Sequence, residues 1–209
     1  APRLLPARAE GSFLTAEDLY KLLSTLRTLD AVRRFFCQNK SGEEEPSEVN
    51  ASVLSECFAG IVPFPWVISD IDSIIDRTGG IRDSASPRLM ELRRQIASAQ
   101  ASMSAVMSRV LARASAAGAV DKDTAPAMRD GRLCIPVEAS HKREVNGIIH
   151  DRSSTGKTIF IEPSELVEAG NRLRELELDE YREQIVILTE VTSRIRPLIP
   201  DILASIELL

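Results

Sequence analysis

The sequence predicts a mostly α fold, in which a long antiparallel helical lever carries a small antiparallel β clamp inserted at its tip. Two helical patterns of similar length, at about residues 86–117 and 164–196, predict the two arms of the lever. Between them lies a β-rich stretch at residues 131–163, in which residues 132–139 alternate apolar and polar side chains with the period of two that is typical of strands. The alternative interpretation is a plain helical bundle with a peripheral hairpin.

Residues 1–85 are predicted to form a helical core segment. One apolar stripe is formed by Leu19, Leu22, Leu23, Leu26, Leu29, Val32, Phe35 and Phe36. Thr15 with Asp18 resembles a helix-capping box. Three further elements are expected here: a polar, acidic loop at 40–48, a shorter helix at 49–59, and a short helix near Ile68–Asp76.

Residues 86–125 are predicted to form the ascending lever helix. Ser86 followed by Pro87 is a strong helix start, and Gly118 is a plausible stop. The spacing of three and four predicts a heptad seam of Leu89, Leu92, Ile96, Ala99, Met103, Val106 and Val110. We expect this seam to pack mainly against the returning helix. Residues 164–209 would form that descending helix, to about Arg196, and the return to the core.

Residues 126–163 are predicted to form a β-rich clamp. Strands are expected at about residues 132–139, 145–150 and 158–162, linked by turn-forming residues. The simplest arrangement is a three-stranded antiparallel meander. Pro136 cannot donate to a ladder, so its strand should lie at an edge or carry a bulge.

Composition excludes some classes of function. The net charge of −5 argues against polyanion binding by bulk charge, but five basic and three acidic residues give residues 131–158 a charge of +2. Cys37, Cys57 and Cys134 have no zinc or redox spacing, which suggests a reducing cytoplasm. No membrane span or signal peptide is expected. The ends of the chain suggest a piece of a longer protein.

The catalytic motifs that residues 150–162 resemble are incomplete. Gly156 and Lys157 resemble the end of a phosphate-binding loop, but Asp151 stands where that loop needs glycine, and a strand is expected where it needs a helix. His150 is best explained as a turn cap, because adjacent strand residues such as His150 and Asp151 point to opposite faces. Glu162 has no identifiable partner. No catalytic residue and no metal site is predicted.

Residues 132–177 nevertheless resemble one family, the second bacterial MutS lineage, here called MutS-two. The runs R-x-x-x-P-V, G-x-x-H-D-x-S-x-[ST]-G-x-T-x-F-x-E-P and N-x-L occur in order. The residues that carry them are Arg132, Pro136, Val137, Gly147, His150, Asp151, Ser153, Thr155, Gly156, Thr158, Phe160, Glu162, Pro163, Asn171 and Leu173. The stretch from Ile74 to Ile96 is similar to the family's run at the start of the lever helix, and the resemblance covers nearly the whole chain.

The resemblance implies the core, lever and clamp of a dimeric DNA-binding ATPase that engages branched DNA and restrains recombination. ATP and Mg, and possible nuclease activity, would belong to domains beyond Leu209, so this chain itself would be no enzyme and would bind no cofactor. The alternative implication is a dimer-forming lever of a ribosome-associated ATPase, with ribosomal RNA as the contacted nucleic acid.

The predicted nucleic-acid contacts lie on the turns of the clamp, where long cations and hydroxyls can reach phosphates. They are Lys142, Arg143, Arg152, Ser153, Ser154, Lys157 and Thr158. Arg132, Pro136, Gly147, His150, Asp151, Gly156, Phe160, Glu162 and Pro163 are expected to be structural. For residues 151–157 we expect a closed hairpin with Gly156 at positive φ, and with His150 and Thr158 near its mouth.

Overall fold

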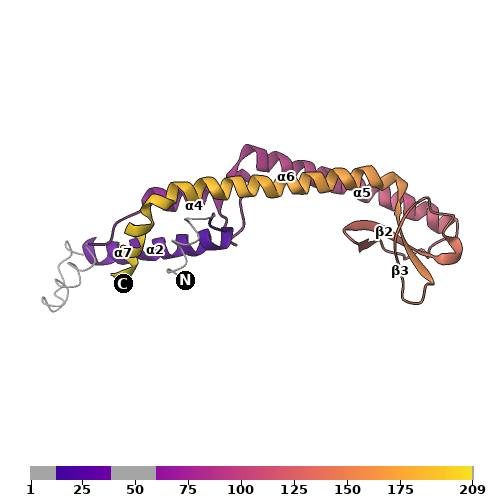
Figure 1. The fold of residues 1–209 in the computed structure, drawn as a ribbon, viewed down its shortest axis with the longest axis horizontal. Coiled ribbons are helices and arrows are strands. Elements are labelled where there is room, and N and C mark those ends of the chain that lie inside the picture. Colours follow the sequence, from indigo (N-terminus) through magenta and orange to yellow (C-terminus); the bar gives the residue numbers. More distant parts are fainter. Residues whose placement is uncertain (1–12, 39–59, 209) are drawn as a thin grey trace. The chain divides into compact units, whose positions relative to one another are not determined.

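The computed structural model describes residues 13–38 and 60–208 of the 209-residue chain, and helices hold most of them (Figure 1). The helices are α2 (Ala16–Gln38), α4 (Pro65–Ile74), α5 (Pro87–Ala116), α6 (Ser164–Ile195) and α7 (Ile199–Glu207), with short 3-10 turns η3 (Asp83–Ala85), η4 (Ala139–His141) and η5 (Arg196–Leu198). The strands are β1 (Ala127–Arg129), β2 (Arg132–Glu138), β3 (Gly147–Arg152) and β4 (Thr158–Pro163). The predicted loop at 40–48, the predicted helix at 49–59, Cys57 and the side chain of Cys37 lie outside the described residues.

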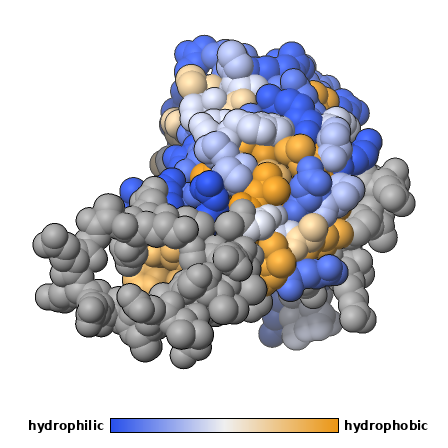
Figure 2. All heavy atoms as spheres, turned by 90° about the vertical axis from the view of Figure 1, so that its left-hand side faces the viewer, coloured by the Kyte–Doolittle hydropathy of each residue, from blue (hydrophilic) through white to orange (hydrophobic). Residues whose placement is uncertain are grey.

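The chain divides into two compact units, Ala1–Met90 with Arg182–Leu209, and Glu91–Tyr181. In the first unit, leucines of α2 pack with α4, α7 and the end of α6 in one apolar core, whereas Phe35 of the predicted stripe is exposed. The predicted capping box begins α2, since Asp18 N donates to Thr15 Oγ1 and Thr15 N donates to Asp18 Oδ2, both at 3.2 Å. Figure 2 faces this unit and shows hydrophobic patches between hydrophilic side chains.

The two long helices begin and end close to the predicted residues. Ser86 caps α5, because its Oγ accepts a hydrogen bond of 2.9 Å from Leu89 N. Gly118 follows the end of α5 with a φ of +73°, a conformation that glycine adopts without strain. The charge pairs between Arg93 and Glu180, and between Arg113 and Glu165, show that the two helices run antiparallel in the second unit. None of the described helices is both long and apolar enough to cross a membrane.

The sheet in the second unit has four antiparallel-paired strands in the order β1-β2-β4-β3. The predicted meander is therefore wrong: β4 lies between β2 and β3, which run parallel to each other. The connection at 139–146 crosses the sheet rather than forming a tight turn, and Val145 within it is buried in the core. The order fits burial, because Ile159 and Ile161 of β4 are buried in the middle of the sheet.

Strand β1 was not predicted, and it forms a hairpin with β2 through Asp130 and Gly131. β1 pairs only with residues 132–134, so β2 has no neighbour on that side at Pro136. The prediction that this strand lies at an edge or carries a bulge is wrong, because β2 lies between β1 and β4 and pairs with both in regular register; β1 ends before it reaches Pro136. The core beneath the sheet contains Ile135 and Val137 of β2, packed on Met103 and Met107 of α5 and Leu166 of α6.

Candidate nucleic-acid interface

The β3–β4 connection is a closed hairpin, as predicted. Ser153 N donates to Thr158 O at 2.8 Å, and Gly156 N donates to Ser153 O at 2.8 Å. Gly156 has a φ of +70°, which confirms the expected left-handed turn residue. Lys157 leads into a strand rather than a helix, so this stretch does not have the geometry of a phosphate-binding loop.

The three predicted hydroxyl groups differ in their availability. Ser153 Oγ accepts a hydrogen bond of 3.0 Å from Thr158 N, and it lies 3.4 Å from Thr155 Oγ1. Ser153 therefore helps to close the hairpin, whereas Ser154 is exposed at its tip and the Thr158 side chain is half-buried. Of the predicted hydroxyl donors, Ser154 is the best placed for an external ligand.

The four predicted cations are all exposed. Arg152 and Lys157 flank the hairpin, and Lys142 and Arg143 lie in the connection between β2 and β3. That connection begins beside the hairpin, since Ala139 N donates to Lys157 O at 2.8 Å. Within residues 13–38 and 60–208, none of these four side chains takes part in an ion pair or a hydrogen bond. Their charges are therefore available to an anionic ligand.

A buried ionic network lies at the other end of β4. The Glu162 carboxylate accepts from Arg132 Nη1 at 3.3 Å, and its second oxygen lies 2.7 Å from His150 Nε2. Arg132 Nη2 also donates to Asn171 Oδ1 of α6 at 2.8 Å. The Glu162 side chain is 3% exposed and that of Arg132 19%, so the charges are largely withdrawn from water. The network ties β2, β3 and β4 to the first turns of α6.

A β-bulge explains why His150 can reach Glu162. Ile149 pairs with Ile161 and Asp151 pairs with Phe160, which leaves His150 as the extra residue of β3. The interpretation of His150 as a turn cap is wrong, because its ring pairs with Glu162. The bulge cancels the strict alternation on which that interpretation depended. Glu162, for which the sequence identified no partner, has two, Arg132 and His150.

Gly147 permits this network to close. A Cβ atom at Gly147 would lie 2.1 Å from the Glu162 carbonyl oxygen, which is too close for any side chain. Gly147 pairs with Pro163, and Ser164 N donates to Asn146 O at 3.0 Å directly beside this pair. Strand β3 therefore passes the end of β4 at a distance that only glycine allows.

A second charged cluster covers the face of the sheet opposite the core. The Arg129 guanidinium carbon lies 3.8 Å from the centre of the Phe160 ring, and Arg129 Nε lies 3.2 Å from Asp151 Oδ2. Cys134 is buried on the same face, and burial, assisted by the charge of Glu162, raises the pKa of its thiol to about 11. The thiol is therefore inert at neutral pH.

Arg129 was missed because β1 was missed. Asp130-Gly131 is a strong hairpin signal when it lies between two runs of strand-forming residues. Both residues have positive φ, 48° and 71°, as a two-residue turn of this kind requires. That signal would have placed Arg129 on the sheet.

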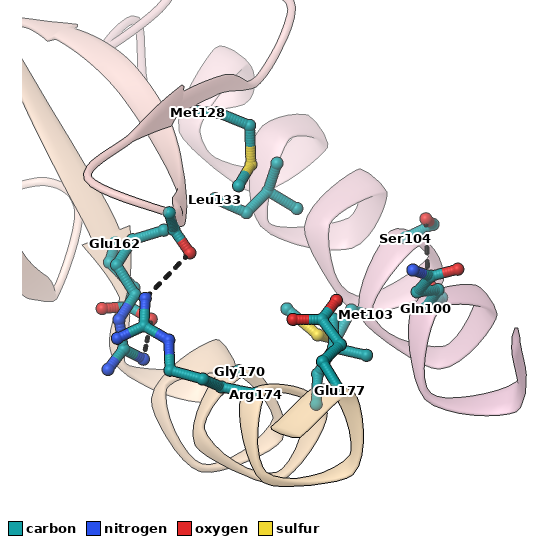
Figure 3. A pocket seen from close by; sticks show the side chains of 12 residues that line it. Gln100, Met103, Ser104, Met128, Leu133, Glu162, Gly170, Arg174 and Glu177 are labelled. Carbon is teal, nitrogen blue, oxygen red and sulfur yellow. Dashed lines mark hydrogen bonds and ion pairs between the residues drawn. The ribbon is translucent and has the colours of Figure 1, made fainter. Parts of the chain in front are cut away.

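A pocket of about 380 Å³ lies between the β1–β2 hairpin and helices α5 and α6. Figure 3 shows Met128 and Leu133 on one side, with Met103 and Glu177 facing them. Glu162 and Arg132 of the ionic network form part of its wall. Among the described residues, no three His, Cys, Asp or Glu side chains gather in a way that could hold a metal ion.

The structure thus defines a predominantly helical segment whose small sheet presents cations on its turns that have no partner among the residues described. No family model matches the chain. It is similar to proteins named Endonuclease MutS2: 33% identical over 98% of the chain to that of Thermomicrobium roseum, 32% over 96% to that of Pelotomaculum thermopropionicum, and 32% over 95% to that of Halalkalibacterium halodurans. The chain spans about a quarter of the length of these relatives, 25%, 24% and 25% respectively. It belongs to the MutS2 family, and it corresponds to one segment of its members.

Proposed function

We propose that this chain is the non-catalytic core, lever and clamp of a MutS2-type DNA-binding ATPase, and that the clamp contacts the backbone of branched DNA. The observation that carries the proposal is the set of four exposed cations without partners among the described residues, Lys142, Arg143, Arg152 and Lys157. Long cations on turns reach phosphates without reading bases, so the contact would be independent of sequence.

The proposal also concerns the complete protein to which this segment would belong. ATP and Mg binding, any nuclease activity and the formation of a homodimer would lie in other parts of that protein, which would be cytoplasmic and would restrain recombination. The relatives' name, which includes the word endonuclease, supports a nucleic-acid partner. A ribosome-associated role, with ribosomal RNA as the contacted backbone, is the competing outcome of the test below.

The test compares two matched pairs of substitutions in the complete protein. Arg152→Ala/Lys157→Ala removes two cations from the hairpin, whereas Arg94→Ala/Arg172→Ala removes two exposed cations from α5 and α6 of the same unit. Each lost phosphate contact should lower the slope of log affinity against log salt by about 1, so the hairpin pair should lower it by roughly 2. The control pair should leave the slope unchanged.

Binding is measured on four-way junction DNA and on stalled ribosomes, at several salt concentrations. Weaker junction binding by the hairpin pair alone supports the proposal. Unchanged junction affinity at low salt contradicts it. If the hairpin pair weakens binding to ribosomes alone, the contacted backbone is ribosomal RNA rather than DNA. Adding Lys142→Ala/Arg143→Ala then shows whether the β2–β3 connection belongs to the same surface.

A further inference from the structure

The face of Phe160 is turned away from the core of its unit. Ile159 and Ile161, its neighbours on β4, are buried in the core beneath the sheet, so the alternation of the strand places Phe160 on the opposite face. The ring is partly exposed, and β4 is a central strand of the sheet. A partly exposed aromatic ring on a central strand, on the face opposite the core, is unusual for a residue whose role is only to fill a core.

The Arg129 side chain already uses this ring as a stacking surface. Its guanidinium lies 3.8 Å above the ring centre, and the pairing with Asp151 holds it there from the next strand. A guanidinium is planar, as a nucleobase is, so the contact shows that a flat group fits over Phe160. Small antiparallel sheets bind single-stranded nucleic acid by this chemistry, with bases stacked on aromatic side chains of the open face.

Two cations lie close to this ring, near the edge strand β3. Arg152 pairs with Ile159, so its side chain starts on the face opposite Phe160, and Lys157 lies on the β3–β4 hairpin beside it. Both cations lack partners within the described part of the chain, so phosphates next to a base stacked on Phe160 could reach them around the β3 edge of the sheet.

We infer that Arg129 and Phe160 form a stacking site for one unpaired nucleobase, which lies on the Phe160 ring while Arg129 moves over or beside it. The inference rests on the proposed contact with nucleic acid and narrows it to strands with unpaired nucleotides, such as those at branches and loops. DNA and RNA offer the same base chemistry, so both are included in the test.

The probe is a duplex with one unpaired 2-aminopurine, made as DNA and as RNA, and binding to the complete protein is followed by the quenching of its fluorescence. Phe160→Leu keeps an apolar side chain but removes the ring, and should weaken binding of the probe roughly tenfold and abolish the quenching. Phe160→Tyr keeps the ring and should preserve both. The matched control is Tyr181→Leu, which removes an aromatic side chain that is 62% exposed on α6.

The salt dependence separates this inference from the proposed function. Phe160→Leu should leave the salt slope and the affinity for a fully paired duplex unchanged, whereas Arg152→Ala/Lys157→Ala should lower the slope on both probes. If the hairpin pair lowers the slope while Phe160→Leu leaves quenching intact on DNA and on RNA, the stacking site is rejected and the backbone contact stands. Lost quenching in Phe160→Tyr also rejects the site. If Phe160→Leu abolishes the quenching while the hairpin pair leaves the slope unchanged, the stacking site stands and the backbone contact fails.

Discussion

Replacing Arg132 by methionine tests whether the ionic network holds the sheet together. Methionine fills much of the arginine volume but leaves the Glu162 carboxylate, 3% exposed, with His150 as its remaining partner in the network. Breaking a buried ion pair by removing one partner costs about 3–5 kcal/mol, because an uncompensated charge stays buried. Arg132 is 19% exposed and His150 remains at 2.7 Å, so we expect the lower end, about 3 kcal/mol.

The loss in the free energy of unfolding is measured by urea denaturation of the chain, monitored by far-UV circular dichroism. Thermal melting gives a second measure. For a chain of this size, 3 kcal/mol corresponds to a fall in Tm of roughly 6–12 °C. Arg174→Met is the matched control, because Arg174 lines the same pocket but, within the described part of the chain, donates hydrogen bonds only to the carbonyl oxygens of Asp130 and Gly131, at 3.4 and 3.3 Å. It should change stability by no more than about 0.5 kcal/mol.

A double-mutant cycle with Glu162→Gln assigns the cost to the pair itself. Once the carboxylate is neutral, removal of Arg132 strands no charge, so the double variant should be more stable than the sum of the single losses predicts. Equal small losses for Arg132→Met and Arg174→Met, with strictly additive behaviour in the cycle, would refute the idea that Glu162 is a buried charge that needs Arg132.

Two further predictions concern the hairpin and the start of α6. Gly156→Val should destabilise the chain by about 1–3 kcal/mol and Lys157→Ala by less than about 0.5, because only the first forces a β-branched residue to a φ of +70°; equal melting temperatures would contradict this. The hydrogen bond from Arg113 lowers the pKa of Glu165 below its ordinary 4.5, so its stabilisation is full above that pH and is lost as the pH falls through the lowered value. Because the pair is exposed, the free energy of unfolding of the wild type should exceed that of Glu165→Gln by less than about 1 kcal/mol at pH 7. This difference should shrink below pH 4.5, and a difference that grows in acid would contradict the prediction.

The helices could be predicted because their limits are set by local chemistry. The Ser86 cap, the Gly118 stop and the start of α6 at Ser164 each depend on residues within one turn of the helix end. The antiparallel arrangement followed from two arms of similar length joined by a short insertion. None of these inferences required knowledge of distant contacts.

The order of the strands could not be predicted in the same way. Neighbouring strands in sequence usually pair, so a meander was the simplest expectation for three strands. Burial explains why the meander does not form. Ile159 and Ile161 of β4 are buried, which suits a central strand, whereas Ile148 and Ile149 of β3 are 49% and 43% exposed, which suits an edge strand. Alternation was visible in each strand, but the sequence does not show which strand has a neighbour on both sides.

The residues that carry the family resemblance are mostly those that hold the frame of the sheet. Gly147 lets the backbone pass Glu162, the bulge turns His150 toward it, and Arg132 connects it to α6. The exposed cations Lys142 and Arg143 carry no part of the resemblance. Similarity to the family therefore predicts the residues that hold the sheet together much better than it predicts the proposed binding surface. A buried charge constrains the residues around it, whereas an exposed lysine does not. The proposed contact with nucleic acid must for this reason be tested on the exposed cations and on Phe160, with the residues that hold the sheet together left unchanged.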